Sequence, residues 1–160
     1  MMQLLAQEEY GLRCLIELSR HEGSRPLTIH EIARAEGLSP DYAAKLLREL
    51  RRGGLVVSTR GASGGYRLSR GPGTITVWDA IQVLGGSLFP ASFCECHGGQ
   101  RERCVRSNDC SLRALWRALD SAVKDVLSRI TLEDIQRSEP SMVSWLEQVP
   151  TSNEPIRSTP

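Results

Sequence analysis

The 160-residue chain is long enough for one compact domain with an appendage and too short for two independent hydrophobic cores. Its 40% hydrophobic and 24% charged residues are usual for a soluble protein, and no apolar run approaches the roughly 20 residues of a membrane span. These values exclude a membrane protein, and the net charge of +1 gives no sign of a strongly charged chain as a whole.

The N-terminal ten residues bear on the compartment. They lack the basic segment followed by an apolar stretch that a secretory signal requires. We therefore expect a cytoplasmic protein whose cysteines meet a reducing environment.

Start signals for three helices follow one another in the first third of the chain. Apolar residues recur at helical spacing between positions 4 and 18, which predicts a first amphipathic helix. Thr28 stands three residues before Glu31, the spacing of a capping box. Ser39 precedes a proline, which is a favourable cap followed by a favourable first helical residue. Because only the short turn 36–38 separates the second and third helices, the pattern predicts a helix-turn-helix.

A β-hairpin is predicted after the third helix. The strand-like segments 55–57 and 66–68 flank a glycine-rich stretch at 61–65, as in a hairpin with a flexible tip. Thr76 then predicts the cap of a further helix that ends at Gly85-Gly86. Residues 1–86 are therefore predicted to form a winged helix-turn-helix DNA-binding domain, mainly α-helical with a small β-hairpin wing.

Charge is concentrated on the third helix and the wing. Between positions 45 and 70 seven basic residues face one acid, so this window carries +6 and the rest of the chain −5. Such asymmetry favours a surface for double-stranded DNA, with a solvated helix face as the alternative reading. Early residues of a recognition helix reach base edges, later basic ones reach phosphates, and a wing arginine can enter the minor groove. The DNA-binding candidates are Ser39, Asp41, Tyr42, Lys45, Arg48, Arg51, Arg52, Arg60 and Arg67.

The C-terminal half divides into three segments. Residues 87–110 show no periodicity and hold four of the five cysteines, which predicts an irregular cysteine-rich loop. From 112 to 130 apolar residues recur at spacings of three, four and seven, which predicts a helix of about 19 residues and roughly 28 Å. A small winged domain cannot easily bury that stripe, so we expect a homodimer, with packing onto the chain's own first helix as the alternative. Residues 111–138 are thus predicted to be a dimerisation helix and a short following helix, and 139–160 a loosely ordered tail.

The loop cysteines indicate a metal centre. Cys94, Cys96, Cys104 and Cys110 lie within 17 residues, together with His97. In a reducing compartment such grouping favours metal over disulfide, and thiolates suit both iron–sulfur clusters and zinc. Spacing alone leaves both open, as well as a redox dithiol or inert cysteines. Cys14 lies within the first predicted helix and reads as a small buried hydrophobe.

Three motifs together resemble one known family. They are Tyr42 on the third helix, the wing sequence at 60–68, and the Cys104-x5-Cys110 pair that leads into residues 114–117. Over about residues 1–137 the chain resembles the Rrf2 family of winged-helix regulators, which includes the iron–sulfur assembly regulator IscR and the nitric-oxide sensor NsrR. The resemblance implies a homodimer with crossing C-terminal helices and a cluster of two or four irons held by three loop cysteines and a variable fourth ligand.

The resemblance also implies a ligand set. It assigns Cys96, Cys104 and Cys110 to the cluster, with Cys94 or Glu9 competing for the fourth place. The cysteine spacing is similar to the nitric-oxide-sensor branch, whereas the segment around Trp116 is similar to the assembly-regulator branch. The histidine ligand of the latter falls on Arg113, which cannot bind iron, and a glutamate of its recognition helix falls on Ala44.

The sequence therefore predicts a sequence-specific transcription regulator whose operator binding is controlled by an iron–sulfur cluster that senses nitric oxide, redox stress or iron–sulfur status. One alternative is a winged-helix regulator with structural zinc or a thiol switch. Another is an iron–sulfur electron-transfer or carrier protein. We expect no enzyme and no small-molecule substrate, because the sequence has no nucleophile–base pairing, phosphate loop or hydrolytic metal motif.

Overall fold

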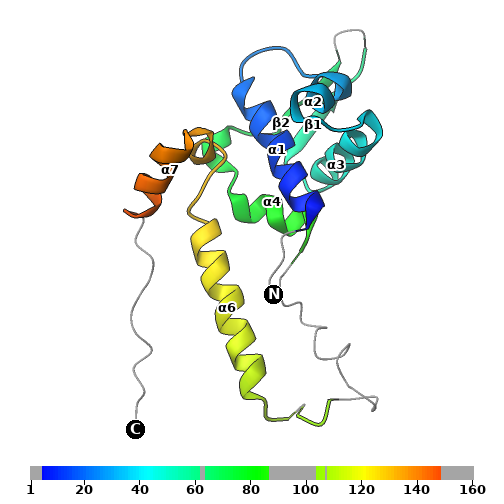
Figure 1. The fold of residues 1–160 in the computed structure, drawn as a ribbon. Helices are drawn as coiled ribbons and strands as arrows, with labels where there is room; N and C mark the ends of the chain where they lie inside the picture. The colour runs from blue at the N-terminus through cyan, green and yellow to red at the C-terminus, as the bar shows by residue number, and fades with distance from the viewer. Residues whose placement is uncertain (1–4, 62–63, 87–103, 107, 149–160) are drawn as a thin grey trace.

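A computed structural model describes residues 5–61, 64–86, 104–106 and 108–148 of the chain. Helices α1 to α4 and the hairpin form one body, from which α6 extends (Figure 1). The fold is mainly helical with a two-stranded hairpin, as predicted. None of the helices in these ranges is long and apolar enough to cross a bilayer. The elements are α1 (Ala6–Arg20), α2 (Ile29–Glu36), α3 (Pro40–Arg52), β1 (Val56–Thr59), β2 (Gly65–Leu68), α4 (Val77–Leu84), α6 (Ser111–Leu127) and α7 (Glu139–Leu146), with 3-10 turns at Pro72–Thr74 and Asp134–Gln136.

The helix-turn-helix forms through the predicted caps. The backbone N–H of Glu31 donates to Thr28 Oγ1 at 3.3 Å, and the N–H of Thr28 donates to the Glu31 carboxylate at 2.8 Å. Helix α2 is capped at its C-terminus by Gly37, whose φ of 66° lies in the left-handed region that favours glycine. The N–H of Tyr42 then donates to Ser39 Oγ at 3.3 Å and starts α3. Both predicted helix starts are confirmed.

The core lies between α1, α3, α4 and the hairpin. Helix α1 contributes Cys14 and Leu15, both with no exposed surface, and the inner face of α3 contributes three buried leucines. Burying each leucine stabilises the fold by about 1.5–3 kcal/mol, so this cluster fixes how α3 sits on α1. Its most buried large side chains are Leu15, Ile32, Leu46, Leu47, Leu50, Val56, Ile75 and Leu132.

The wing is fastened to the start of the helix-turn-helix. Strands β1 and β2 are antiparallel, with Val56 opposite Leu68. The loop before α2 adds a bridge, because Leu27 N–H donates to the Tyr66 carbonyl at 2.9 Å and Tyr66 N–H donates to the Leu27 carbonyl at 2.7 Å. A Cβ on Gly65 would stand 2.5 Å from the Leu27 carbonyl oxygen, which explains the glycine there.

Helix α6 is shorter than predicted, with 17 residues, and ends at Leu127. Ile130 leaves the helical stripe: it is buried against Val77 and Ile81, and its carbonyl accepts a hydrogen bond from Val77 N–H at 2.8 Å. The chain turns after α6 because this segment pairs with the strand-like residues before α4. Helix α6 itself extends away from α1 (Figure 1), so the alternative of packing onto the first helix is wrong. Its apolar face stays exposed at Leu112 and, at 49% and 43% of their surface, at Leu115 and Leu119.

The prediction of a loosely ordered tail over 139–160 is wrong for Glu139–Leu146, which form α7. Pro140 lies in the first turn, where a proline forfeits no hydrogen bond. Met142 and Trp145 pack against the buried cluster that includes Ile130, and the Arg137 guanidinium lies 4.8 Å from the Trp145 ring centre. Residues 149–160 lie outside the described part of the chain.

Candidate nucleic-acid interface

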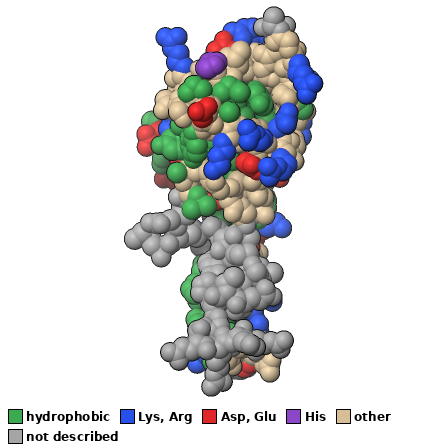
Figure 2. All heavy atoms as spheres, turned by 90° about the vertical axis from the view of Figure 1, so that its right-hand side faces the viewer, with side chains coloured by type: hydrophobic (Ala, Val, Ile, Leu, Met, Phe, Trp, Pro, Cys, Tyr) green, Lys and Arg blue, Asp and Glu red, His purple; other side chains and the backbone are tan. Residues whose placement is uncertain are grey.

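Helix α3 separates its apolar and basic residues onto opposite faces. Its leucines are buried, whereas Asp41, Lys45 and Arg48 are exposed on the outer side. Lys and Arg side chains gather on the side of the winged domain where α3 lies (Figure 2). The basic residues that the sequence places on the third helix therefore lie on its solvent-facing side.

The basic residues of α3 differ in how they are held. Arg51 Nη1 donates to Ser58 Oγ of the wing at 3.2 Å, and Arg52 pairs with Glu49 at 3.1 Å. Within the described ranges no ion pair engages Lys45 or Arg48. Lys45 and Arg48 are thus the side chains most available to an incoming polyanion, while Arg51 joins α3 to the wing.

An open groove of ≈580 Å³ lies between the starts of α2 and α3 and the end of the wing where β1 stops and β2 begins. It brings together three predicted residues, Asp41, Arg51 and Arg60. It also includes His30 and Thr59, which are not among the predicted DNA-binding residues. No local signal marks these two, because only the pairing of the wing with the loop before α2 places them on this groove.

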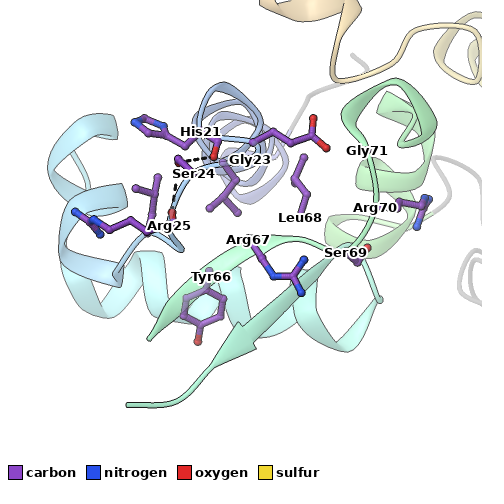
Figure 3. Close-up of a pocket in the computed structure, with 13 residues that line it drawn as sticks. His21, Gly23, Ser24, Arg25, Tyr66, Arg67, Leu68, Ser69, Arg70 and Gly71 are labelled. Atoms are coloured by element: carbon purple, nitrogen blue, oxygen red, sulfur yellow. Dashed lines mark hydrogen bonds between the residues drawn. The ribbon is translucent and has the colours of Figure 1, made fainter. Parts of the chain in front are cut away.

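Arg67 does not line that groove. It lies instead at a second hollow of ≈370 Å³ between β2 and the loop after α1, with Arg25 and Arg70 nearby (Figure 3). Arg70 pairs with Asp79 at 2.9 Å. The hydrogen bond from Arg25, with those from Thr28, lowers the pKa of Glu31 to about 2, so this capping carboxylate stays ionised. The structure therefore separates Arg67 from Arg60.

Tyr42 is half-buried and is held at the start of α3. Its ring meets the ring of Tyr10 from α1 edge-on, with centres 5.9 Å apart and planes at 82°. The exposed hydroxyl of Ser39 accepts the N–H of Tyr42 as a cap. Ser39, Asp41 and Tyr42 therefore lie in a helix start that is fixed by a cap and by an aromatic pair, and the fourth predicted base-contacting residue, Lys45, lies one turn further along α3.

Two of the predicted cluster ligands lie within the described residues of the cysteine loop. Cys104 and Cys110 are half-buried free thiols, and the Cys110 side chain makes no capping hydrogen bond where α6 begins. Both thiols are thus available as soft ligands, which fits a cluster or zinc. Cys94 and Cys96 lie outside the described residues.

The described residues of one chain do not assemble a metal site by themselves: they contain no group of three or more metal-ligating side chains. Glu9 is exposed on α1, and the end of α6 that begins at Ser111 lies far from α1 (Figure 1). Cys14 has no exposed surface, and burial raises the pKa of its thiol to about 12, which confirms the interpretation of a buried hydrophobe.

Known proteins match this chain over most of its length. Residues 4–138 match a family model described as Rrf2, iron-dependent transcriptional regulator. The transcriptional regulator CymR of Bacillus subtilis is 37% identical over 134 residues, which cover 84% of this chain and 89% of the relative. The regulator IscR of Xenorhabdus nematophila is 30% identical over 138 residues, which cover 86% of this chain and 81% of the relative.

Solved structures are similar over the same part of the chain. CymR, described as the global cysteine regulator of B. subtilis, has a solved structure with a TM-score of 0.68 at 36% identity, and the match covers 84% of this chain and 96% of the CymR chain. The structure of IscR from T. potens has a TM-score of 0.67 at 31% identity, and the match covers 84% of this chain and 85% of the IscR chain.

Proposed function

We propose a function from one premise: the chain belongs to the Rrf2 family of transcriptional regulators. It is a DNA-binding winged-helix regulator and not an enzyme, as the sequence predicted. The finer proposal is that α3 reads a double-stranded operator in the cytoplasm under the control of an iron–sulfur cluster. The observation that carries the DNA part is the outward basic face of α3, which continues into the groove beside the wing.

In this proposal the first turn of α3 enters the major groove. Ser39, Asp41, Tyr42 and Lys45 lie where the early residues of a recognition helix reach base edges. The later arginines lie along the same helix, where they would neutralise phosphates. The residues proposed for the backbone and the minor groove are Arg48, Arg51, Arg52, Arg60 and Arg67.

The exposed face of α6 supports a homodimer. Leu112, Leu115 and Leu119 are each 43–53% exposed on one helix face, which is costly for a protein that stays monomeric. A second copy offers the same face and would bury both in a two-fold arrangement. Two recognition helices related by such an axis would meet half-sites about 34 Å apart.

Cys96, Cys104 and Cys110 would hold the cluster, with Cys94 or Glu9 as the fourth ligand. The bound group would supply a centre of two or four irons that reacts with nitric oxide and oxidants. Because Cys110 stands directly before Ser111 of α6, its ligation would fix the start of the dimerisation helix. The distance of α1 from that point favours Glu9 of the partner subunit over Glu9 of the same chain.

A second candidate rests on the similarity to CymR, which is described as the global cysteine regulator of B. subtilis. In it, the loop cysteines hold zinc or form a thiol switch, and the protein responds to thiol chemistry without a cluster. The two candidates differ in metal content. The electron-transfer alternative is set aside because the family consists of transcriptional regulators.

The DNA part is tested by a salt series on a duplex that the protein selects from a randomised library. About ten neutralised phosphates give a slope of log affinity against log salt near −9, and loss of one contact reduces it by about 0.9. We expect Lys45→Ala to weaken binding and Lys124→Ala, a matched exposed lysine on α6, to leave it unchanged. Equal effects of the two variants would contradict the proposed face.

The cluster part is tested by purification without oxygen, followed by assays for iron, sulfide and zinc. We expect a coloured protein with iron and sulfide that Cys104→Ala lacks. Separate Cys94→Ala and Glu9→Ala variants then assign the fourth ligand, because only the true ligand changes the visible spectrum. A colourless protein with stoichiometric zinc would support the second candidate instead.

A further inference from the structure

The turn of the helix-turn-helix is held from outside by an arginine of α1. Arg13 Nε donates to Glu36 Oε2 at 2.8 Å, and Arg13 Nη2 donates to the backbone carbonyl of Glu36 at 2.9 Å. Glu36 is the last residue of α2, where carbonyls have no partner within the helix. Its side chain is only 10% exposed, so the carboxylate depends on this arginine for its charge partner.

The same helix also holds the other side of the turn. The Tyr10 ring packs edge-on against Tyr42, in the first turn of α3. The Arg13 guanidinium lies 5.3 Å from the centre of the Tyr10 ring, within the range of a cation–π contact. Tyr10 therefore touches the start of α3, Arg13 touches the end of α2, and the two side chains contact each other.

The turn is also held by Leu38, which packs against the hydrophobic core. It passes through Gly37 in the left-handed region, and the Leu38 N–H donates to the Ala33 carbonyl at 2.8 Å. Beyond it, the cap from Ser39 to Tyr42 N–H fixes the helix start but not the angle between the two helices. Core packing of α2 and α3 sets the overall angle between the two helices, and the contacts of Tyr10 and Arg13 with both helices hold that angle at the turn itself.

We propose that Tyr10 and Arg13 are positioning residues for sequence recognition: they hold the first turn of α3 at the angle at which it reads base edges. The inference rests on the proposed function, because it assumes that this turn meets the bases. Loss of the pair would disturb base contacts, which need close alignment. It would leave non-specific binding intact, since the phosphate-contacting arginines lie further along α3 and on the wing.

The test compares affinities of the full-length protein for two duplexes. One is the duplex that the wild-type protein selects from a randomised library, and the other is a scrambled duplex of the same length. We expect Arg13→Ala and Tyr10→Ala to lower the ratio of the two affinities roughly tenfold, comparable to one lost base contact. The affinity for the scrambled duplex and the salt slope should stay at wild-type values.

Three further variants sharpen the test. Arg13→Lys keeps the charge but lacks the planar fork, so it should recover only part of the ratio; it also carries the test if Arg13→Ala fails to fold. The Arg13→Ala/Glu36→Ala double variant should be no worse than Arg13→Ala, because both changes remove one contact. Arg20→Ala is the control on the same helix, since its contact with Glu17 is a long surface ion pair of 3.7 Å.

The outcomes separate this inference from the function on which it rests. A wild-type protein that binds both duplexes equally would overturn the proposed function. A wild-type protein that discriminates, with Arg13→Ala and Tyr10→Ala variants that discriminate equally well, would overturn only the positioning role. A salt slope reduced by about 0.9 in Arg13→Ala would make Arg13 a phosphate contact and would equally overturn it.

Discussion

Replacing Leu115 and Leu119 together by alanine should weaken association of the chain with itself. In one chain the two side chains keep 49% and 43% of their surface exposed. Complete burial of a leucine is worth about 1.5–3 kcal/mol, so burying the exposed remainder is worth about 1 kcal/mol for each. A two-fold interface counts every substitution twice. After the methyl group that alanine retains is allowed for, the loss is about 3 kcal/mol, or roughly hundredfold in the dimer Kd.

Sedimentation equilibrium over a concentration series measures this Kd directly. Val143→Ala is the matched control, because Val143 is 52% exposed but lies on α7 instead of α6. We expect the control to associate like the wild type. A double variant with wild-type association, or a wild-type protein that is monomeric at all concentrations, would refute the assignment of the α6 face.

Other predictions concern stability. Ser39→Ala removes the cap of α3 and should lower the free energy of unfolding by about 1 kcal/mol in urea melts; no change would mean that the cap is dispensable. Gly65→Ala places a Cβ against the Leu27 carbonyl and should cost about 1–3 kcal/mol, measured in the same way, whereas an unchanged midpoint would contradict the close approach. Burial raises the pKa of the Cys14 thiol to about 12, whereas the unfolded thiol ionises near about 8.5. The free energy of unfolding should therefore fall as the pH rises from about 8.5 toward 12, because the unfolded thiol ionises before the buried one. This fall should be less steep in Cys14→Ala. The same pH dependence in the wild type and the variant would contradict the effect of burial.

The helix starts were predictable from sequence because capping is local. The capping partners are Thr28 with Glu31 and Ser39 with Tyr42. The two residues of each pair lie within one helical turn, so their spacing in the sequence is enough to predict the hydrogen bond. Ile130 shows where local reading fails. It continues the helical spacing of α6, yet it is buried against α4, because pairing with a segment more than fifty residues earlier competes with the helix.

The candidate interface also has one part that the local sequence predicts and one part that depends on contacts between distant segments. The outward basic face of α3 follows from helical periodicity alone. The groove beside the wing does not, because His30 and Arg60 become neighbours only through the bridge between Leu27 and Tyr66. The tail prediction failed at α7 because a proline such as Pro140 is compatible both with the end of a helix and with its first turn.

We propose that a cluster on the loop cysteines controls how α3 meets DNA. The most direct test of this proposal is the affinity of protein purified without oxygen for its selected duplex, measured before and after the cluster is removed with nitric oxide or an oxidant and chelator. We expect Kd to change about tenfold or more between the two states, which is within the usual range of coupling between two sites. The same Kd in both states, in a protein that contains iron and sulfide, would contradict the proposal.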